Sequence, residues 1–330
     1  MKFWHKFLAV GVIGAVMVGS VATSNAQQKR EQQQNAAMVQ QAANQQATDQ
    51  VQSSTGSGPV NVNNTLTPGV GQRLVIFVND WNQTIWVEAI TSFGGPLPAT
   101  HWVLPQGASV SISVPDHWDG RFWGDTDCSV DATGQPTGCA TGHCPPGTSC
   151  EGGAASFATL AEFNMQYPGA NDIYDVSLVD GYNLPIYINT IGGSTPDVLS
   201  AHGCLSAPVV PGGTTCTTDA NVLCANSQYS DLQVTDASGN VIACKSACTE
   251  LEAEGNTPDD VAADPYCCPG GTAHGTTQTC QPDTWPPELG SNKIFKQAEP
   301  FAYSYTFDDG TSTLSCAGSC GYQITFGVSG

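Results

Sequence analysis

The chain has 330 residues, with 9 lysines and arginines against 29 aspartates and glutamates, and its formal net charge is −20. Nucleic acids and anionic membranes are bound through positive charge, so this composition argues against both as partners. It permits a cation, a basic partner or a neutral ligand such as a sugar, although solubility alone accounts for most of the charges.

Residues 1–26 have the pattern of a secretory signal peptide. Positively charged residues precede an apolar run from Phe7 to Val18, and Ser24-Asn25-Ala26 supplies the small residues of a cleavage site. An uncleaved membrane anchor is ranked second, because this apolar run is short for a membrane-spanning helix. No other segment is apolar enough to cross a membrane. We therefore expect an exported protein without a membrane span after signal removal, extracellular or, in a Gram-negative bacterium, periplasmic.

Residues 27–70 are rich in Gln, Asn and Ala and contain no aromatic residue. A segment of this composition cannot bury enough apolar surface to offset the entropy that it loses on ordering. We predict a disordered linker here, so that the folded domain spans residues 71–330.

Short β-rich segments begin at Arg73. Residues 73–80 and 84–90 are separated by a turn-forming tetrapeptide, a pattern that predicts a hairpin, and residues 109–115 alternate between apolar and polar side chains. Further strands are predicted at 157–164, 173–178, 184–188, 301–307 and 322–326. Many short strands with hardly any long helix predict an all-β sandwich or barrel, whose core is completed by the C-terminal strands.

All 14 cysteines follow residue 127, and an even number at close spacing in an exported chain predicts seven disulfides. They are Cys128, Cys139, Cys144, Cys150, Cys204, Cys216, Cys224, Cys244, Cys248, Cys267, Cys268, Cys280, Cys316 and Cys320. We expect no metal site, because the closest cysteine pairs lack histidines at zinc-finger spacing, and no cofactor.

Eight of these cysteines lie from Cys204 to Cys280, in a stretch that has little apolar material. Such a stretch cannot form a core of its own, so we predict a disulfide-rich, partly helical subdomain over residues 204–290, inserted between strands of the sandwich. One helix is expected over residues 243–254 and should end at Gly255.

Three carboxylates sit in or beside predicted strands: Glu162, Asp175 and Asp180. Burying an unpaired carboxylate is costly, so each of them is paired, solvated or functional. Strand alternation places Asp175 on the face opposite its two neighbours, and Asp180 with the glycine after it is typical of a turn. In the purely structural alternative, Asp180 caps that turn and Glu162 pairs with Arg121.

Two sets of residues near the first cysteines receive structural interpretations. The aromatic residues are expected in the core: Trp118, Phe122 and Trp123. The histidines are interpreted as surface or loop residues rather than ligands: His101, His117 and His143.

Six motifs in order give the chain a family resemblance. They are WGDTDC (123–128), GCATGHC (138–144), TLAEF (159–163), DVSLVDGYNLP (175–185), YCC (266–268) and AYSY (302–305). With these motifs the chain resembles, over roughly residues 72–327, the thaumatin-like proteins, which include plant pathogenesis-related defence proteins of the osmotin and thaumatin type. The resemblance implies a flattened β-sandwich beside a disulfide-rich, partly helical subdomain, with an acidic cleft between them.

The resemblance also implies a disulfide pattern. Family members usually carry one more bridge than this chain allows, and the missing pair falls at Trp81 and Gly327. A family cysteine near Ala298 and Glu299 is also absent, whereas Cys320 is extra. The implied pairs are 128–139, 144–150, 204–316, 216–320, 224–244, 248–267 and 268–280.

In the family, an arginine and a further aspartate accompany the three carboxylates of the cleft. Alignment places Gln106 at the arginine and Phe301 at the aspartate, and His143 stands where the family has an aspartate. The resemblance implies that Glu162 is a proton donor and Asp180 its catalytic partner. Substrate-binding roles are implied for the other positions of the cleft: Asp175, Gln106 and Phe301.

Two carboxylates on either side of a glycosidic bond can hydrolyse it as an acid paired with a base or nucleophile. The resemblance implies binding of β-1,3-glucan or a related cell-wall polysaccharide, with weak endo-β-1,3-glucanase activity in some members. The alternative is a non-catalytic defence, antifungal or cell-surface interaction protein. In each case we expect a monomer.

Overall fold

The structure is a computed structural model that describes residues 66–130, 136–143, 157–166, 169–193, 219–256, 262–268 and 280–327. The expected signal peptide and nearly all of the expected linker lie outside these ranges, as do Cys144, Cys150, Cys204 and Cys216. Among the described residues, no helix is long and apolar enough to cross a membrane.

The strands of the described chain are short, and so are its helices. The strands are β1 (Gln72–Asn79), β2 (Ile85–Phe93), β3 (His101–Leu104), β4 (Ser109–Pro115), β5 (Asp119–Asp125), β6 (Ser129–Val130), β7 (Pro136–Gly138), β8 (Leu160–Asn164), β9 (Asn171–Ser177), β10 (Ile186–Ile191), β11 (Gln233–Thr235), β12 (Val241–Cys244), β13 (Leu314–Ala317) and β14 (Gly321–Phe326). The α-helices are α2 (Ala220–Cys224), α3 (Ala247–Ala253), α4 (Asp264–Cys267), α5 (Ser291–Ala298) and α6 (Asp309–Ser312). Three 3₁₀ turns complete the set: η2 (Ser227–Leu232), η3 (Pro282–Thr284) and η4 (Pro287–Leu289).

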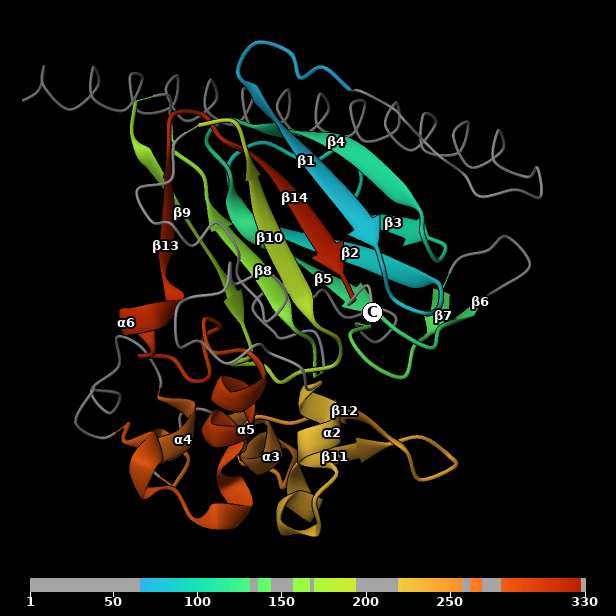
Figure 1. Ribbon diagram of the computed structural model, residues 1–330, viewed down its shortest axis with the longest axis vertical. Helices are drawn as coiled ribbons and strands as arrows, with labels where there is room; N and C mark the ends of the chain where they lie inside the picture. The colour runs from blue at the N-terminus through green and yellow to red at the C-terminus, as the bar shows by residue number, and fades with distance from the viewer. Residues whose placement is uncertain are drawn as a thin grey trace, which may run out of the picture. The chain divides into compact units, whose positions relative to one another are not determined.

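Two sheets form the body of the protein (Figure 1). One has four strands in the order β10-β14-β1-β4, and the other has six in the order β13-β9-β8-β5-β2-β3. Aromatic rings from both sheets meet between them: Phe77 of β1 lies 5.0 Å from Phe122 of β5 and 5.0 Å from Trp102 of β3, measured between centroids. The prediction of an all-β sandwich is confirmed, and so is the burial of Trp118, Phe122 and Trp123.

The predicted hairpin of residues 73–90 is wrong. Strand β1 pairs in parallel with β14 and antiparallel with β4, whereas β2 pairs with β3 and β5 in the other sheet. Buried Asn79 stabilises the crossing between the sheets, because its side chain donates to the carbonyls of Gln83 and Leu104 and accepts from the amide of Trp81. A sandwich corner of this kind shares its local residue pattern with a hairpin.

Trp81 and Gly327, the two positions of the missing family bridge, lie against each other. Gly327 has a φ of +92°, and a Cβ built on it would lie 2.4 Å from the backbone nitrogen of Trp81. A glycine is therefore needed where the backbones approach this closely.

The predicted strand at 301–307 is also wrong. Only Tyr303 bridges to the end of β9, at Ser177. The neighbouring backbone groups are taken by side chains, since Asp308 accepts from the amide of Ser304 and Lys296 donates to the carbonyl of Ala302. The missed strand is β13, which pairs with β9 along the sheet edge.

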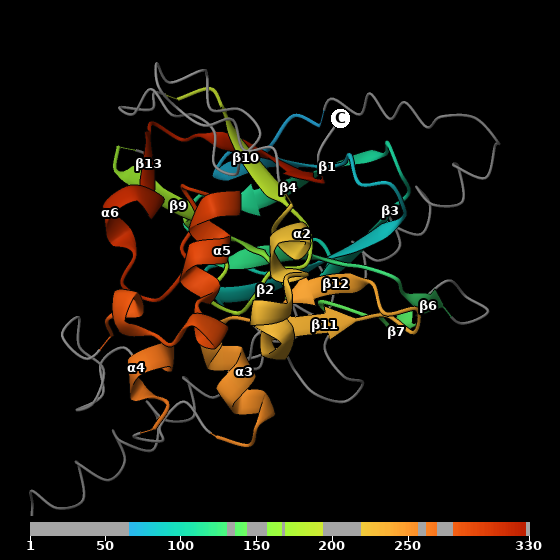
Figure 2. The ribbon, with the colours of Figure 1, turned by 60° about the horizontal axis from the view of Figure 1, so that its bottom comes forward.

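Short helices gather with β11 and β12 at one end of the sheets, which Figure 2 turns toward the viewer. This region is joined to the sandwich by paired backbone bonds of 2.8 Å between Tyr182 and Cys244. The expected helix begins at Ala247, later than predicted, because the preceding residues pair as β12 and Ser246 caps the helix. The expected end is confirmed, with Gly255 at a φ of +95°.

Four of the implied disulfides are confirmed: 128–139, 224–244, 248–267 and 268–280. Cys316 is bonded to Cys320, so the implied pairs 204–316 and 216–320 are wrong. The turn between β13 and β14, with positive φ at Gly318 and Ser319, brings these two cysteines together. The implied 144–150 pair lies outside the described residues.

Candidate functional site

Three charged side chains form a row across the six-stranded sheet. Strands β5, β8 and β9 are neighbours, and their register places Arg121 opposite Glu162 and Glu162 opposite Asp175. Directly opposite residues project from the same face of a sheet, within reach of each other. Tyr174 and Val176 point to the other side and are buried in the core, as the alternation predicts.

Asp180 reaches this row from the turn that follows β9. The turn is closed by a bond from the amide of Gly181 to the carbonyl of Leu178, and Gly181 has a φ of +108°. Asp180 Oδ2 thereby lies 3.9 Å from Arg121 Nη1, while Glu162 Oε1 lies 3.6 Å from the same nitrogen. Arg121 thus forms ion pairs with two of the three carboxylates.

Two adjoining cavities meet at this row, and both are lined by Arg121, Glu162 and Asp175. The larger has a volume of about 410 Å³ and extends along Asp119 and Ile173. The smaller has a volume of about 220 Å³ and is also lined by Ser177, Val179, Asp180, Tyr303 and Thr306. We call the two together the acidic cleft.

The carboxyl groups of the acidic cleft hold their protons more tightly than free carboxylates do. Burial raises the pKa of Glu162, with Arg121 opposing the rise and Asp180 adding to it. Burial raises the pKa of Asp175 well above its usual range, and the charges of Glu162 and Asp309 raise it further. The pKa of Asp180 is raised by burial and lowered by Arg121.

The side chains remain open to a ligand, since 35% of Glu162, 23% of Asp180 and 24% of Arg121 is exposed. A carboxyl group with a raised pKa in an open cavity can donate a proton, and a neighbouring carboxylate with an arginine can accept or orient hydroxyl groups.

Of the five site residues expected from the sequence, the structure brings together Glu162, Asp175 and Asp180. Gln106 is exposed in the turn between β3 and β4, Phe301 is half-buried, and neither lines the acidic cleft. The positive partner that the alignment gave as lost is present as Arg121. The ion pair between Arg121 and Glu162, weighed as a structural alternative, is confirmed.

Two further residues were not expected in the site. Tyr303 lines the smaller cavity and donates its hydroxyl to Asp309 at 2.8 Å, and Asp309 in turn raises the pKa of Asp175. Tyr303 lies in the AYSY motif, which was a signal for its place near the cleft, whereas nothing in the sequence marks Asp309 as more than a turn residue.

Comparison with known proteins places this chain in a family. Residues 79–328 match the sequence profile described as the Thaumatin family. The chain belongs to the thaumatin family. Thaumatin-like protein 1 of Pyrus pyrifolia is 40% identical over 261 residues, which cover 78% of this chain and 92% of that protein. Pathogenesis-related protein 5 of Arabidopsis thaliana is 38% identical over 263 residues, covering 79% and 93%.

Among the other relatives of this thaumatin-family chain, a protein of Prunus avium named glucan endo-1,3-beta-glucosidase is 37% identical over 261 residues, covering 78% of this chain and 91% of the relative. A laminaripentaose-producing beta-1,3-glucanase, solved in complex with laminaritetraose, aligns with a TM-score of 0.48 at 14% identity, covering 78% of this chain and 99% of that one.

Proposed function

We propose that this thaumatin-family protein is exported and binds a β-1,3-glucan or a related neutral cell-wall polysaccharide in the acidic cleft. One observation carries the proposal: a single arginine lies between Glu162 and Asp180, beside Asp175, whose pKa is raised well above its usual range, where two open cavities meet. This arrangement presents hydrogen-bond donors and acceptors side by side, which suits the hydroxyl groups of a neutral sugar.

Any hydrolysis would be slow, with Glu162 as the proton donor and Asp180 as its partner. Glu162 is suited to donation because its pKa is raised and its side chain is exposed to the cavities. Asp180 is placed to act as the nucleophile or base, with its charge stabilised by the Arg121 guanidinium 3.9 Å away. Burial and the charge of Asp180 hold the proton on Glu162, and Asp175 lies directly opposite it on β9. The name of the Prunus avium relative is consistent with this chemistry.

Export is supported by the disulfides. Every described cysteine is bonded, and bonded cysteines at this density fit an oxidising compartment. The alternative, a defence or cell-surface interaction protein without turnover, uses the same fold.

One experiment on a single preparation distinguishes an enzyme from a binding module without turnover. Wild type, Glu162→Gln and Asp180→Asn are tested for retention on insoluble β-1,3-glucan and for release of reducing ends. An exposed carboxylate outside the cleft, Glu288 in η4, gives the matched control Glu288→Gln.

If the protein is an enzyme, both cleft variants lose turnover while they are still retained on the glucan, and Glu288→Gln behaves like wild type. If it is a binding module, wild type is retained without turnover and the cleft variants are retained less. Wild type that is neither retained nor active overturns the proposal and favours an interaction protein.

A further inference from the structure

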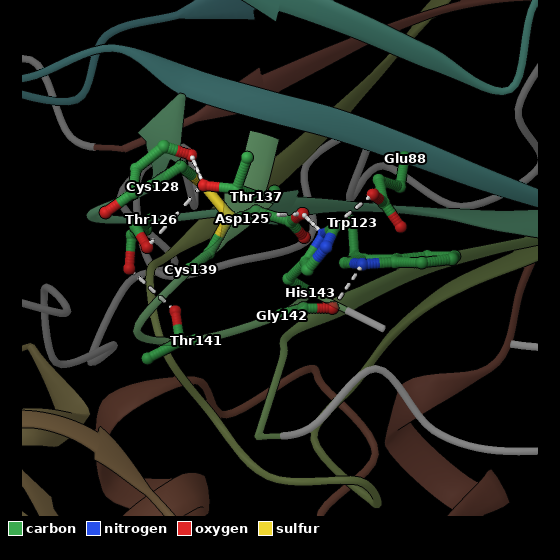
Figure 3. A network of polar contacts seen from close by, with 12 residues as sticks. Glu88, Trp123, Asp125, Thr126, Cys128, Thr137, Cys139, Thr141, Gly142 and His143 are labelled. Atoms are coloured by element: carbon green, nitrogen blue, oxygen red, sulfur yellow. Dashed lines mark hydrogen bonds and ion pairs between the residues drawn. A yellow bond between two sulfur atoms is a disulfide. The ribbon is translucent and has the colours of Figure 1, made fainter. Parts of the chain in front are cut away.

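A second group of titratable side chains lies on the same sheet face as the acidic cleft. Alternate residues of β5 project to this face, so Asp125 follows Arg121 and Trp123 along it. Glu88 of β2 is paired with Trp123 and is therefore diagonal to Asp125. Figure 3 shows the imidazole of His143 meeting the carboxylates of Glu88 and Asp125.

His143 is brought to this face by a segment that is fixed at several points. The Cys128–Cys139 disulfide closes the loop, and the hydroxyls of Thr126 and Thr141 are 2.6 Å apart. The carbonyl of Gly142 accepts a 2.9 Å bond from the indole of Trp123.

Gly142 itself is required in this segment. It has a φ of +84°, and a Cβ built on it would lie 2.6 Å from Asp125 Oδ1. His143 is therefore presented to the two carboxylates by the backbone.

Two of the three spacings between the ligand-type atoms match those of a zinc site. His143 Nδ1 lies 3.2 Å from Glu88 Oε1 and 3.2 Å from Asp125 Oδ2, and all three atoms lie within 4.8 Å of one another. In a tetrahedral zinc site, bonds of about 2.0–2.1 Å place neighbouring ligand atoms about 3.3 Å apart. The two observed spacings match that edge.

Asp125 is a buried carboxyl group with one oxygen that makes no hydrogen bond to the described residues. Its side chain is fully buried, and Oδ1 has no hydrogen-bond partner in the described part of the chain. The ion pairs of the described residues give Glu88 and Asp125 no partner except His143. Two carboxyl groups beside one imidazole in a largely buried place would be stabilised by a cation.

We propose that Glu88, Asp125 and His143 bind one divalent metal ion of the zinc class. One oxygen from each carboxylate and Nδ1 of His143 serve as ligands, and solvent takes the fourth position. Calcium and magnesium prefer oxygen ligands alone, so the imidazole favours zinc and its neighbours in the transition series. Of the Glu88 side chain 16% is exposed and of His143 15%, so an ion can enter from solvent.

The ion would tie the loop between Asp125 and His143 to strands β2 and β5. Its role in this position is structural, because none of the three ligands lines the acidic cleft. The inference does not depend on the proposed glucan binding.

Equilibrium dialysis against Zn²⁺, with metal analysis of the dialysed full chain, tests the inference. Wild type is compared with His143→Gln and Glu88→Gln, which keep side-chain shape and leave buried Asp125 in place. Glu288→Gln is the control, since Glu288 is exposed in η4 and lies outside the cluster. Melting temperature with and without Zn²⁺ provides a second readout.

We expect one Zn²⁺ per chain and a raised melting temperature in wild type and in Glu288→Gln. In His143→Gln and Glu88→Gln the association constant should fall by at least about tenfold and the melting shift should disappear, because each lacks one ligand. Glucan retention by His143→Gln should equal that of wild type.

Wild type that binds no Zn²⁺ overturns the inference. Binding that survives unchanged in both His143→Gln and Glu88→Gln also overturns it, because the ion then lies elsewhere. Co²⁺ in place of Zn²⁺ gives an independent check, since its visible absorption would show four-coordinate ligation in wild type and in Glu288→Gln but not in His143→Gln or Glu88→Gln.

Discussion

Two clusters of carboxyl groups lie on one face of the six-stranded sheet, on either side of buried Trp123 of β5. The two clusters differ in the cationic side chain that each contains. In the acidic cleft Arg121 lies 3.6 Å from Glu162 and 3.9 Å from Asp180, and its charge is permanent. In the other cluster an imidazole lies between Glu88 and Asp125. In the cleft, the permanent charge of Arg121 offsets carboxylate charge, so a neutral ligand can bind there. In the second cluster, only a proton or a metal ion can offset the carboxylate charge.

The largest expected effect comes from Gly142→Ala, which disrupts only the second cluster. The added Cβ would meet Asp125 Oδ1 at 2.6 Å in a backbone of φ +84°, so we expect a loss of about 3 kcal/mol in the free energy of unfolding. Urea unfolding measures it.

The matched control for this change is Gly107→Ala in the exposed turn between β3 and β4. Gly107 also has a positive φ, +73°, but none of the described residues comes within 4 Å of its added Cβ. It should lose only about 1 kcal/mol. Equal losses in the two variants would show that the approach to Asp125 costs nothing.

Arg121→Gln removes the cation of the cleft and should have the next largest effect. Without Arg121 the pKa values of Glu162 and Asp180 rise further, because Arg121 lowers both. We expect a loss of about 1–2 kcal/mol near neutral pH, discounted for the partial exposure of the pairs. The loss should shrink in acid, where the carboxyls are protonated in both variants, and Arg121→Lys should restore part of it in urea unfolding.

Trp123→Phe tests the residue that separates the clusters. It keeps the buried ring but removes the indole bond to the carbonyl of Gly142, so we expect a loss of about 1 kcal/mol. Zn²⁺ stoichiometry and glucan retention, measured on the same variant, should both stay at wild-type values. A loss of glucan retention would show that the two clusters are not independent.

The smallest effect is a change of slope with pH in Asp175→Asn. The folded pKa of Asp175 is raised, so the folded state binds its proton more tightly than the unfolded state. Its contribution to stability is therefore present in acid and is lost as pH rises from the unfolded aspartate pKa through the folded one. Asp175→Asn should be more stable than wild type at neutral pH, and urea unfolding across pH should show the difference disappearing in acid.

Local patterns predicted much of the cleft. The alternation of β9 correctly placed Asp175 and Tyr174 on opposite faces of the sheet. The Asp180-Gly181 pair correctly indicated a turn. The position of Arg121 between two carboxylates depends on the neighbouring strands β5 and β8, which no local pattern specifies.

Contacts between distant parts of the chain could not be predicted. His143 is 55 residues from Glu88 and 18 from Asp125, and its loop position gave no sign of either partner. The turn after β1 looked like a hairpin because the crossing depends on bonds from Asn79 to the distant carbonyl of Leu104. The Cys316–Cys320 bond was missed because the family pattern was imposed on a chain with an extra cysteine.

Calorimetric titration with a linear β-1,3-glucan oligosaccharide tests the central claim, that Arg121 and its carboxylates form a sugar-binding cleft distinct from the Glu88 cluster. Wild type and His143→Gln should bind with equal affinity, and Arg121→Gln should bind about tenfold more weakly, the equivalent of one lost charged hydrogen bond. Wild type that does not bind the oligosaccharide, or Arg121→Gln that binds it as tightly as wild type, would contradict the account.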